Sequence, residues 1–321
     1  MSEFQDPKPI PMPTPQEHPL PAAAVSPILS KRHEIILKRI RDIPSLPEVV
    51  NRIIQLLATP GTPASEIATL VSYDPGLTSK VLRMVNSAAY GVQRQVSSIQ
   101  HGIMILGFNT VRGLVLSASI FKLFEKQKGK AIGLDHQAFW EHSILTSVAA
   151  RVAANRLRIP ESDDAFSAGM LHDIGKMVMD VHFHGDYANV MREAKKRRLP
   201  WHGEAFLRLE ESVTGTTHTG IGSYLAAKWR LPITITEVIQ FHHAPWEAEH
   251  CQPLVYLVAL ANELAQVQQD HLGIYQRSYF SEPILEYFNL EDEMVQAMLA
   301  ELKAEMESVG EFMDSLSQQG H

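Results

Sequence analysis

Apolar residues recur at helical spacing along most of the chain, and the alternation typical of β-strands is nowhere sustained. In the first part of the chain the apolar stretches are short and are broken by prolines and glycines, as at residues 60–63 and 74–76. Thr62 or Ser65 is expected to cap the helix that carries Ile67. This pattern predicts an all-α fold that begins with a bundle of short helices joined by tight turns.

The helices predicted after about residue 133 carry an unusual number of histidines. Asp135 is expected to cap a helix whose inward face includes His142, and a following helix is expected to carry both His172 and Asp173. A further helix is predicted around His218. Another is predicted over residues 234–241 and ends at a His-His pair, and a third covers the strongly apolar residues 254–264.

The two ends of the chain differ from this middle part. Residues 1–30 are rich in proline, which interrupts helices and cannot pair in a β-ladder, so a disordered tail with some polyproline II character is predicted. Near the C-terminus an amphipathic stripe predicts a terminal helix, docked on the core or paired with a second copy of the chain. The stripe consists of Met294, Met298, Leu302, Met306 and Val309.

Composition narrows the class of protein. The 321 residues are 45% hydrophobic and 20% charged, as in an ordinary globular protein, and the net charge of -7 argues against direct binding of nucleic acid. The basic run at residues 195–198 is interpreted as a solvated helix end. A single cysteine excludes an intramolecular disulfide, and neither a secretory signal nor an apolar run of about 18 residues is present. A cytoplasmic location without membrane attachment is therefore predicted.

The candidate chemistry lies in the segment Leu171-His172-Asp173-Ile174-Gly175-Lys176 and the histidines around it. If the adjacent imidazole and carboxylate share one helical turn, both can reach one divalent cation. His142 upstream, and His218, His242 and His243 downstream, could supply further ligands. A set rich in imidazole suits Zn, Fe, Mn or Ni better than Mg or Ca, which prefer oxygen ligands.

Short motifs recur in the first part of the chain: Ile43-Pro44-Ser45-Leu46-Pro47, Asp74-Pro75-Gly76-Leu77-Thr78, Asn86-Ser87-Ala88-Ala89-Tyr90, Ser98-Ile99 and Leu106-Gly107. Together they resemble the HDOD family, the HD-related output domain of bacterial signalling proteins, which belongs to the HD phosphohydrolase superfamily and is related to HD-GYP enzymes. The resemblance covers roughly residues 40–270. We expect an HDOD domain at 31–275, with an N-terminal lobe at 31–128 and an HD-like lobe at 135–275, followed by a C-terminal helical segment at 276–321.

The resemblance also implies roles for individual residues. It makes His142, His172, Asp173, His218, His242 and His243 metal ligands, and it makes Lys176 a catalytic group that neutralises phosphate in an active enzyme. The final aspartate of the family pattern would fall at Asn262, which brings no charge, and the position of an HD-GYP glutamate is Ala138. Ala244-Pro245-Trp246 stands where HD-GYP enzymes carry a Gly-Tyr-Pro loop.

Three functions stay open at this point. The missing carboxylates favour a regulatory protein that binds signalling partners or a nucleotide second messenger. An active metal-dependent phosphohydrolase is the alternative, since the remaining ligands could still activate water on a metal. A metal- or redox-sensing switch is the third. A homodimer through the C-terminal helix is also predicted.

Overall fold

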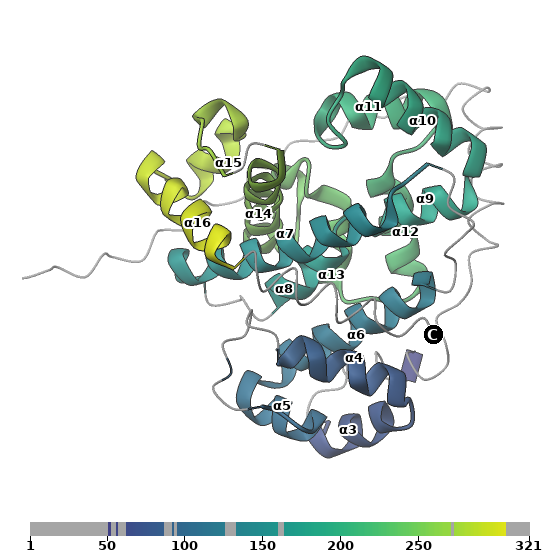
Figure 1. The fold of residues 1–321 in the computed structure, drawn as a ribbon, viewed down its shortest axis with the longest axis vertical. Coiled ribbons are helices and arrows are strands. Elements are labelled where there is room, and N and C mark those ends of the chain that lie inside the picture. Colours follow the sequence, from purple (N-terminus) through teal and green to yellow (C-terminus); the bar gives the residue numbers. More distant parts are fainter. Residues whose placement is uncertain are drawn as a thin grey trace, which may run out of the picture.

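The computed structural model describes residues 62–86, 95–125, 133–159, 164–270 and 273–305, together with Asn51, Arg52, Leu56 and Val92. These parts of the chain contain helices and connecting loops but no β-strand, which confirms the predicted all-α fold. The proline-rich segment and the Ser87–Tyr90 part of the Asn-Ser motif lie outside the described residues. Figure 1 shows a smaller group of helices, α3 to α6, beneath a larger one.

The smaller lobe consists of α3 (Ala64–Ser72), α4 (Pro75–Val85), α5 (Ile99–Leu106) and α6 (Phe108–Glu125). Asp74 caps α4 by accepting a hydrogen bond from the Leu77 amide at 3.0 Å, and Ser98 caps α5. The prediction that Thr62 or Ser65 caps α3 was wrong, because Pro63 occupies the N-cap without a side-chain bond. The hydroxyl of Thr62 instead donates to the carbonyl of Leu56.

Helix α6 joins the two lobes, because it packs on α4 in the smaller lobe and on α8 in the larger one. Gly107 separates α5 from α6. Its φ of 84° lies in the left-handed region, which favours glycine. Further along α6, Gly113 crosses Ser167 of α8 so closely that a β-carbon would lie 1.5 Å from the serine oxygen. The absence of a side chain at Gly113 therefore allows the lobes to meet.

The larger lobe surrounds α14, whose apolar residues are buried on all sides as expected for the central helix of a bundle. Helix α7 packs along α14 and α8, and the side chain of Asp135 caps α7 as predicted. The elements of this lobe are α7 (His136–Leu157), α8 (Ala165–Leu171), α9 (Ile174–His182), α10 (His184–Arg197), α11 (Gly203–Thr214), α12 (His218–Lys228), α13 (Ile233–Phe241), η3 (Pro245–Glu247) and α14 (Gln252–Asp270).

The C-terminal segment closes one side of this lobe with η4 (Arg277–Tyr279), α15 (Glu282–Tyr287) and α16 (Asp292–Ala304). Met298 and Leu302 are buried where α16 meets α7 and α14, and Arg156 of α7 donates to Glu301 at 2.7 Å. The helix is thus docked on the core, and a homodimer through it stays a prediction. The distal part of the stripe, Met306 and Val309, lies outside the described residues.

None of the described helices combines the length and the hydropathy that a membrane span requires.

Candidate metal centre

The His-Asp pair lies at a break between two helices. Helix α8 ends at Leu171, His172 follows it, and Asp173 is the N-cap position of α9. The expectation that His172 and Asp173 continue one helix was therefore wrong. Both side chains at this break lie in the interior, where His172 is fully buried and Asp173 is 1% exposed.

Each of four histidines has its Nδ1 atom held by a neighbouring acceptor. His172 donates to the carbonyl of Gly169 at 2.7 Å, and His242 donates to the carbonyls of Val238 and Ile239 at 3.1 and 3.2 Å. The Nδ1 atoms of His218 and His142 are held in the same way by Glu210 and Gln269, at 2.7 and 2.9 Å. Because these oxygens can only accept, Nδ1 carries the hydrogen and Nε2 presents a lone pair when the ring is neutral.

The Nε2 atoms of these histidines converge on the carboxylate of Asp173. Its Oδ1 lies 3.2 Å from His218 and 3.4 Å from His242, and its Oδ2 lies 3.4 Å from His172 and 3.9 Å from His142. Among the buried atoms without a hydrogen-bond partner in the described part of the chain are Asp173 Oδ1 and the Nε2 atoms of His172, His218, His242 and His243. Unpaired acceptors facing one another are costly in a protein interior unless a cation lies between them.

Near neutral pH the histidine rings are not all protonated, so protons alone do not provide a positive charge throughout the cluster. Burial lowers the pKa of His142 and of His242 to about 4, and burial together with His242 holds the pKa of His243 well below its usual value. His218 differs. Its burial would lower its pKa, but the Glu210 carboxylate outweighs burial and raises it. Most of the cluster is therefore neutral imidazole, the form that binds metals.

Lys176 also lies in this site. It follows Asp173 by three positions on α9, and its Nζ atom lies 2.5 Å from Oδ2 of Asp173 and 2.9 Å from the carbonyl of Trp201. Burial by itself would raise the pKa of Asp173, but Lys176 and His172 outweigh it and hold that pKa well below its usual value. Asp173 is thus an anion at neutral pH.

Two glycines bring the helices of the site together. A β-carbon at Gly175 would lie 1.9 Å from the carbonyl oxygen of His218, and one at Gly222 would lie 2.6 Å from the side chain of Ile239. The contact between Gly175 and the start of α12 sets how closely His218 approaches Asp173. The close packing of α9 against α12 therefore requires a glycine at this position of the His-Asp-x-Gly-Lys motif.

The fold brings together the histidines and the aspartate that the sequence predicted as metal ligands. Two groups, Asp173 with His218, His242 and His243, and His142 with His172 and Asp173, each hold ligand atoms within 4.8 Å of one another and could hold a metal ion. Asn262 is buried on α14 and accepts a hydrogen bond from Gln266 at 3.0 Å. The α14 residue that contacts His142 is Gln269, seven positions further along the same helix.

Sequence reasoning did not find Glu210 or Gln269 as partners of the histidines. Glu210 is fully buried on α11, and its Oε2 atom accepts from both the ring and the amide of His218. A carboxylate behind a histidine orients the ring and raises its basicity, an arrangement common behind metal-binding histidines. Gln269 could have been suspected, because positions 262, 266 and 269 share one face of a helix.

A pocket of about 330 Å³ leads from the surface to one side of the cluster. His142, Asp173 and Lys176 line its inner part, and His202 and Asp270 approach each other to 3.8 Å across its lining. The pocket is therefore large enough for a small ligand beside His142, Asp173 and Lys176.

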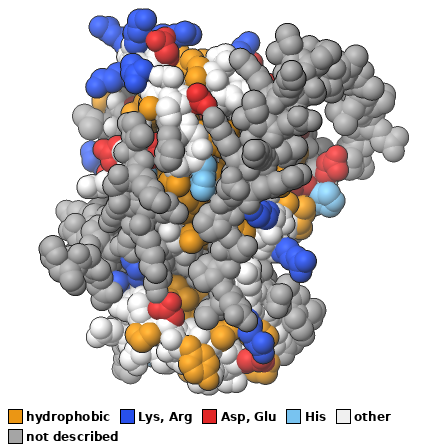
Figure 2. Space-filling model, turned by 90° about the vertical axis from the view of Figure 1, so that its right-hand side faces the viewer, with side chains coloured by type: hydrophobic (Ala, Val, Ile, Leu, Met, Phe, Trp, Pro, Cys, Tyr) orange, Lys and Arg blue, Asp and Glu red, His pale blue; other side chains and the backbone are white. Residues whose placement is uncertain are grey.

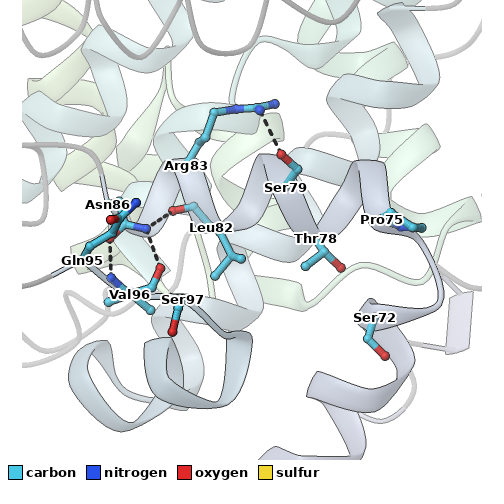
Figure 3. Close-up of a pocket in the computed structure, with 10 residues that line it drawn as sticks. All are labelled: Ser72, Pro75, Thr78, Ser79, Leu82, Arg83, Asn86, Gln95, Val96 and Ser97. Carbon is cyan, nitrogen blue, oxygen red and sulfur yellow. Dashed lines mark hydrogen bonds between the residues drawn. The ribbon is translucent and has the colours of Figure 1, made fainter.

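A second cavity, of about 520 Å³, lies in the smaller lobe beside α4. Figure 3 shows Asn86 facing Val96, with which it exchanges hydrogen bonds, and Arg83 reaching Ser79 along the helix. Asn86 thus ties the end of α4 to the chain before α5.

The basic run at the end of α10 is exposed, as expected for a solvated helix end. Lys196 and Arg197 pair with Glu193 of the same helix. Figure 2 shows Lys and Arg side chains gathered at the end of the molecule where Figure 1 places α10 and α11. The absence of direct nucleic-acid binding stays a prediction.

A family model and a curated protein match this chain. The HDOD domain model matches residues 43–245, more than half of the chain. An uncharacterized protein of Treponema pallidum (strain Nichols) is 27% identical over 228 residues, which are 71% of this chain and 43% of that protein. The chain thus spans less than half the length of this curated relative.

Two solved structures share the fold. The HDOD domain protein with unknown function from Geobacter sulfurreducens has a TM-score of 0.72 at 24% identity, covering 90% of this chain and 98% of that one. A protein named “Putative phosphohydrolase” from Shewanella amazonensis SB2B has a TM-score of 0.69 at 22% identity, covering 87% and 97%. The architecture and the family match together show that the chain belongs to the HDOD family.

Proposed function

We propose that this chain is a regulatory HDOD protein of the bacterial signalling type, which binds partner proteins or a nucleotide second messenger and does not turn over a phosphoester. In this proposal the HD-like lobe holds a divalent cation of the Zn, Fe, Mn or Ni class as part of a scaffold. The ligands would be Asp173 and the histidines gathered around it.

The observation that carries the proposal is the shortage of carboxylates. In each of the two candidate ligand groups of the described chain, Asp173 is the only acidic residue. From α14 the amide of Gln269 contacts His142, and Ala138 of α7 has no side-chain ligand atom. A two-metal hydrolytic centre needs anionic ligands to hold and position both ions, and neutral imidazoles and amides compensate their charge poorly.

The rival function is a metal-dependent phosphohydrolase, favoured by the pocket that reaches His142, Asp173 and Lys176. A metal there would supply hydroxide and polarise the phosphate when bound. Lys176 donates to Asp173 and to the carbonyl of Trp201, and its third N–H could face the phosphate.

Hydrolysis assays separate the two functions. The full chain, loaded in turn with Mn²⁺, Fe²⁺, Ni²⁺ and Zn²⁺, is incubated with cyclic dinucleotides and with bis(p-nitrophenyl) phosphate. The proposal predicts rates no higher than those of Asp173→Asn. Turnover that disappears in both His172→Ala and Asp173→Asn would defeat it. Binding of cyclic dinucleotides is measured in parallel by calorimetry, and partners are sought by cross-linking in the native cell.

A further inference from the structure

The carboxylate of Asp173 divides the cluster into two halves. The Oδ1 half consists of this oxygen with His218, His242 and His243, and the Oδ2 half consists of the other oxygen with His142 and His172. In principle each half could receive one cation, with Asp173 shared between them. The two halves differ in what already lies in them.

The Oδ2 half already contains a positive charge. The ammonium of Lys176 lies 2.5 Å from Oδ2, and the residue is only 6% exposed. Its position is fixed by three features: it lies one turn from Asp173 on α9, it donates to the carbonyl of Trp201, and it lies 5.7 Å from the ring centre of Phe206. This oxygen therefore has the cation that it needs in a buried site.

Among the described residues no lysine or arginine pairs with Oδ1, whose ion-pair contacts are with His218 and His242, at 3.2 and 3.4 Å. Oδ1 and the Nε2 atoms of His218, His242 and His243 are buried without a hydrogen-bond partner. Three lone-pair donors and one carboxylate oxygen within 4.8 Å of one another make a ligand set of the size and type that a transition metal prefers. Glu210 adds a second negative charge directly behind His218.

Charge limits how many ions the whole cluster can hold. Asp173 and Glu210 bring two negative charges, and Lys176 brings one positive charge. One dication leaves the site with a net charge of about +1, whereas two dications leave it at about +3 in a poorly solvated interior, with the second ion facing the ammonium.

We propose that the cluster holds one divalent cation per chain, in the Oδ1 half, and that the ammonium of Lys176 takes the place of a second cation in the Oδ2 half. The inference rests on the proposed metal-holding scaffold and specifies its stoichiometry and its position. Asp173 and three histidines would give a bound ion four protein ligands, a number that is typical of structural sites.

The test measures Co²⁺ binding to the chelator-treated full chain, by elemental analysis after desalting and by titration of the visible Co²⁺ spectrum. The wild-type chain should bind one ion. Lys176→Met removes the charge and should allow a second ion, whereas Lys176→Arg keeps the charge and should bind one. His243→Ala should weaken the first ion by about tenfold or more, and His142→Ala should leave it within about threefold.

Each contrary result overturns the inference. Two ions in the wild type, none in the wild type, or one ion in a folded Lys176→Met would contradict it. Circular dichroism and thermal unfolding establish whether Lys176→Met folds. If it does not fold, the histidine pair decides, because loss of the ion in His142→Ala but not in His243→Ala places the ion in the other half.

The result of this binding test can be distinguished from the result of the hydrolysis assays. Hydrolysis by a chain that binds one ion in the Oδ1 half would defeat the binding function and leave this inference standing. Two bound ions without hydrolysis would overturn this inference and leave the binding function standing.

Discussion

The Nε2 atom of His218 lies 3.2 Å from Oδ1 of Asp173, and the opposite ring nitrogen of the same histidine lies 2.7 Å from the carboxylate of Glu210. His218 therefore stands between two anions. With the hydrogen on Nδ1, the ring turns its lone pair toward Asp173, and a cation between the two atoms would satisfy both.

Removing the charge of Glu210 should weaken metal binding without removing a ligand. In Glu210→Gln the side-chain oxygen can still accept from Nδ1 of His218, but the ring becomes less basic. We expect Co²⁺ affinity to fall about 10- to 100-fold, measured by competition with a chelator. Glu211→Gln, at an exposed position one residue along the same helix, is the control and should bind as the wild type does. Equal affinities in both variants would show that Glu210 does not act through His218.

Gly175 should tolerate no side chain. A β-carbon would lie 1.9 Å from the carbonyl of His218, so α9 and α12 must separate in Gly175→Ala. The free energy of unfolding in urea should fall by at least about 2 kcal/mol, and Co²⁺ affinity should fall with it. Gly185→Ala, where nothing lies within 4 Å of the added carbon, should be neutral or slightly stabilising. A variant at Gly175 that is as stable as the wild type would contradict the close approach.

Glu237 should make stability depend on pH in the acid range. Burial would raise its pKa, but hydrogen bonds from Cys251 and His250, at 3.0 and 2.7 Å, outweigh burial and lower it to about 2. Since the folded-state pKa lies below the usual value, the contribution is present above pH 4.5 and disappears as the pH falls toward 2.

We expect Glu237→Gln to lower the free energy of unfolding by about 2 kcal/mol at pH 7, and by less than half as much at pH 3. Urea unfolding at the two pH values measures both differences. Glu247→Gln, at an exposed position of the same connection, serves as the control. A difference between Glu237→Gln and wild type that is the same at pH 3 as at pH 7 would refute this account.

The sequence predicted the fold class and the members of the cluster well, for physical reasons that can be named. Helical periodicity is a local property, so the all-α fold and the cap at Asp135 follow from neighbouring residues. The break between His172 and Asp173 did not follow, because the apolar period continues through it and tertiary contacts decide where α8 ends.

The sequence pattern alone could not identify the residues that hold the histidine rings. Glu210 looks like any acidic residue of an amphipathic helix, and only the folding of α11 against α12 shows that it holds His218. The contact between Gln269 and His142 joins positions 127 residues apart. Such pairings depend on how helices cross, which periodicity does not encode.

The most direct test of the central claim, that the histidine cluster around Asp173 holds a divalent cation, is elemental analysis of the full chain purified without a histidine tag. The account predicts close to one Zn, Fe, Mn or Ni ion per chain in the wild type, and less than about a tenth of that in a folded Asp173→Asn. A near-zero content in the wild type, or the same content in both proteins, would contradict it.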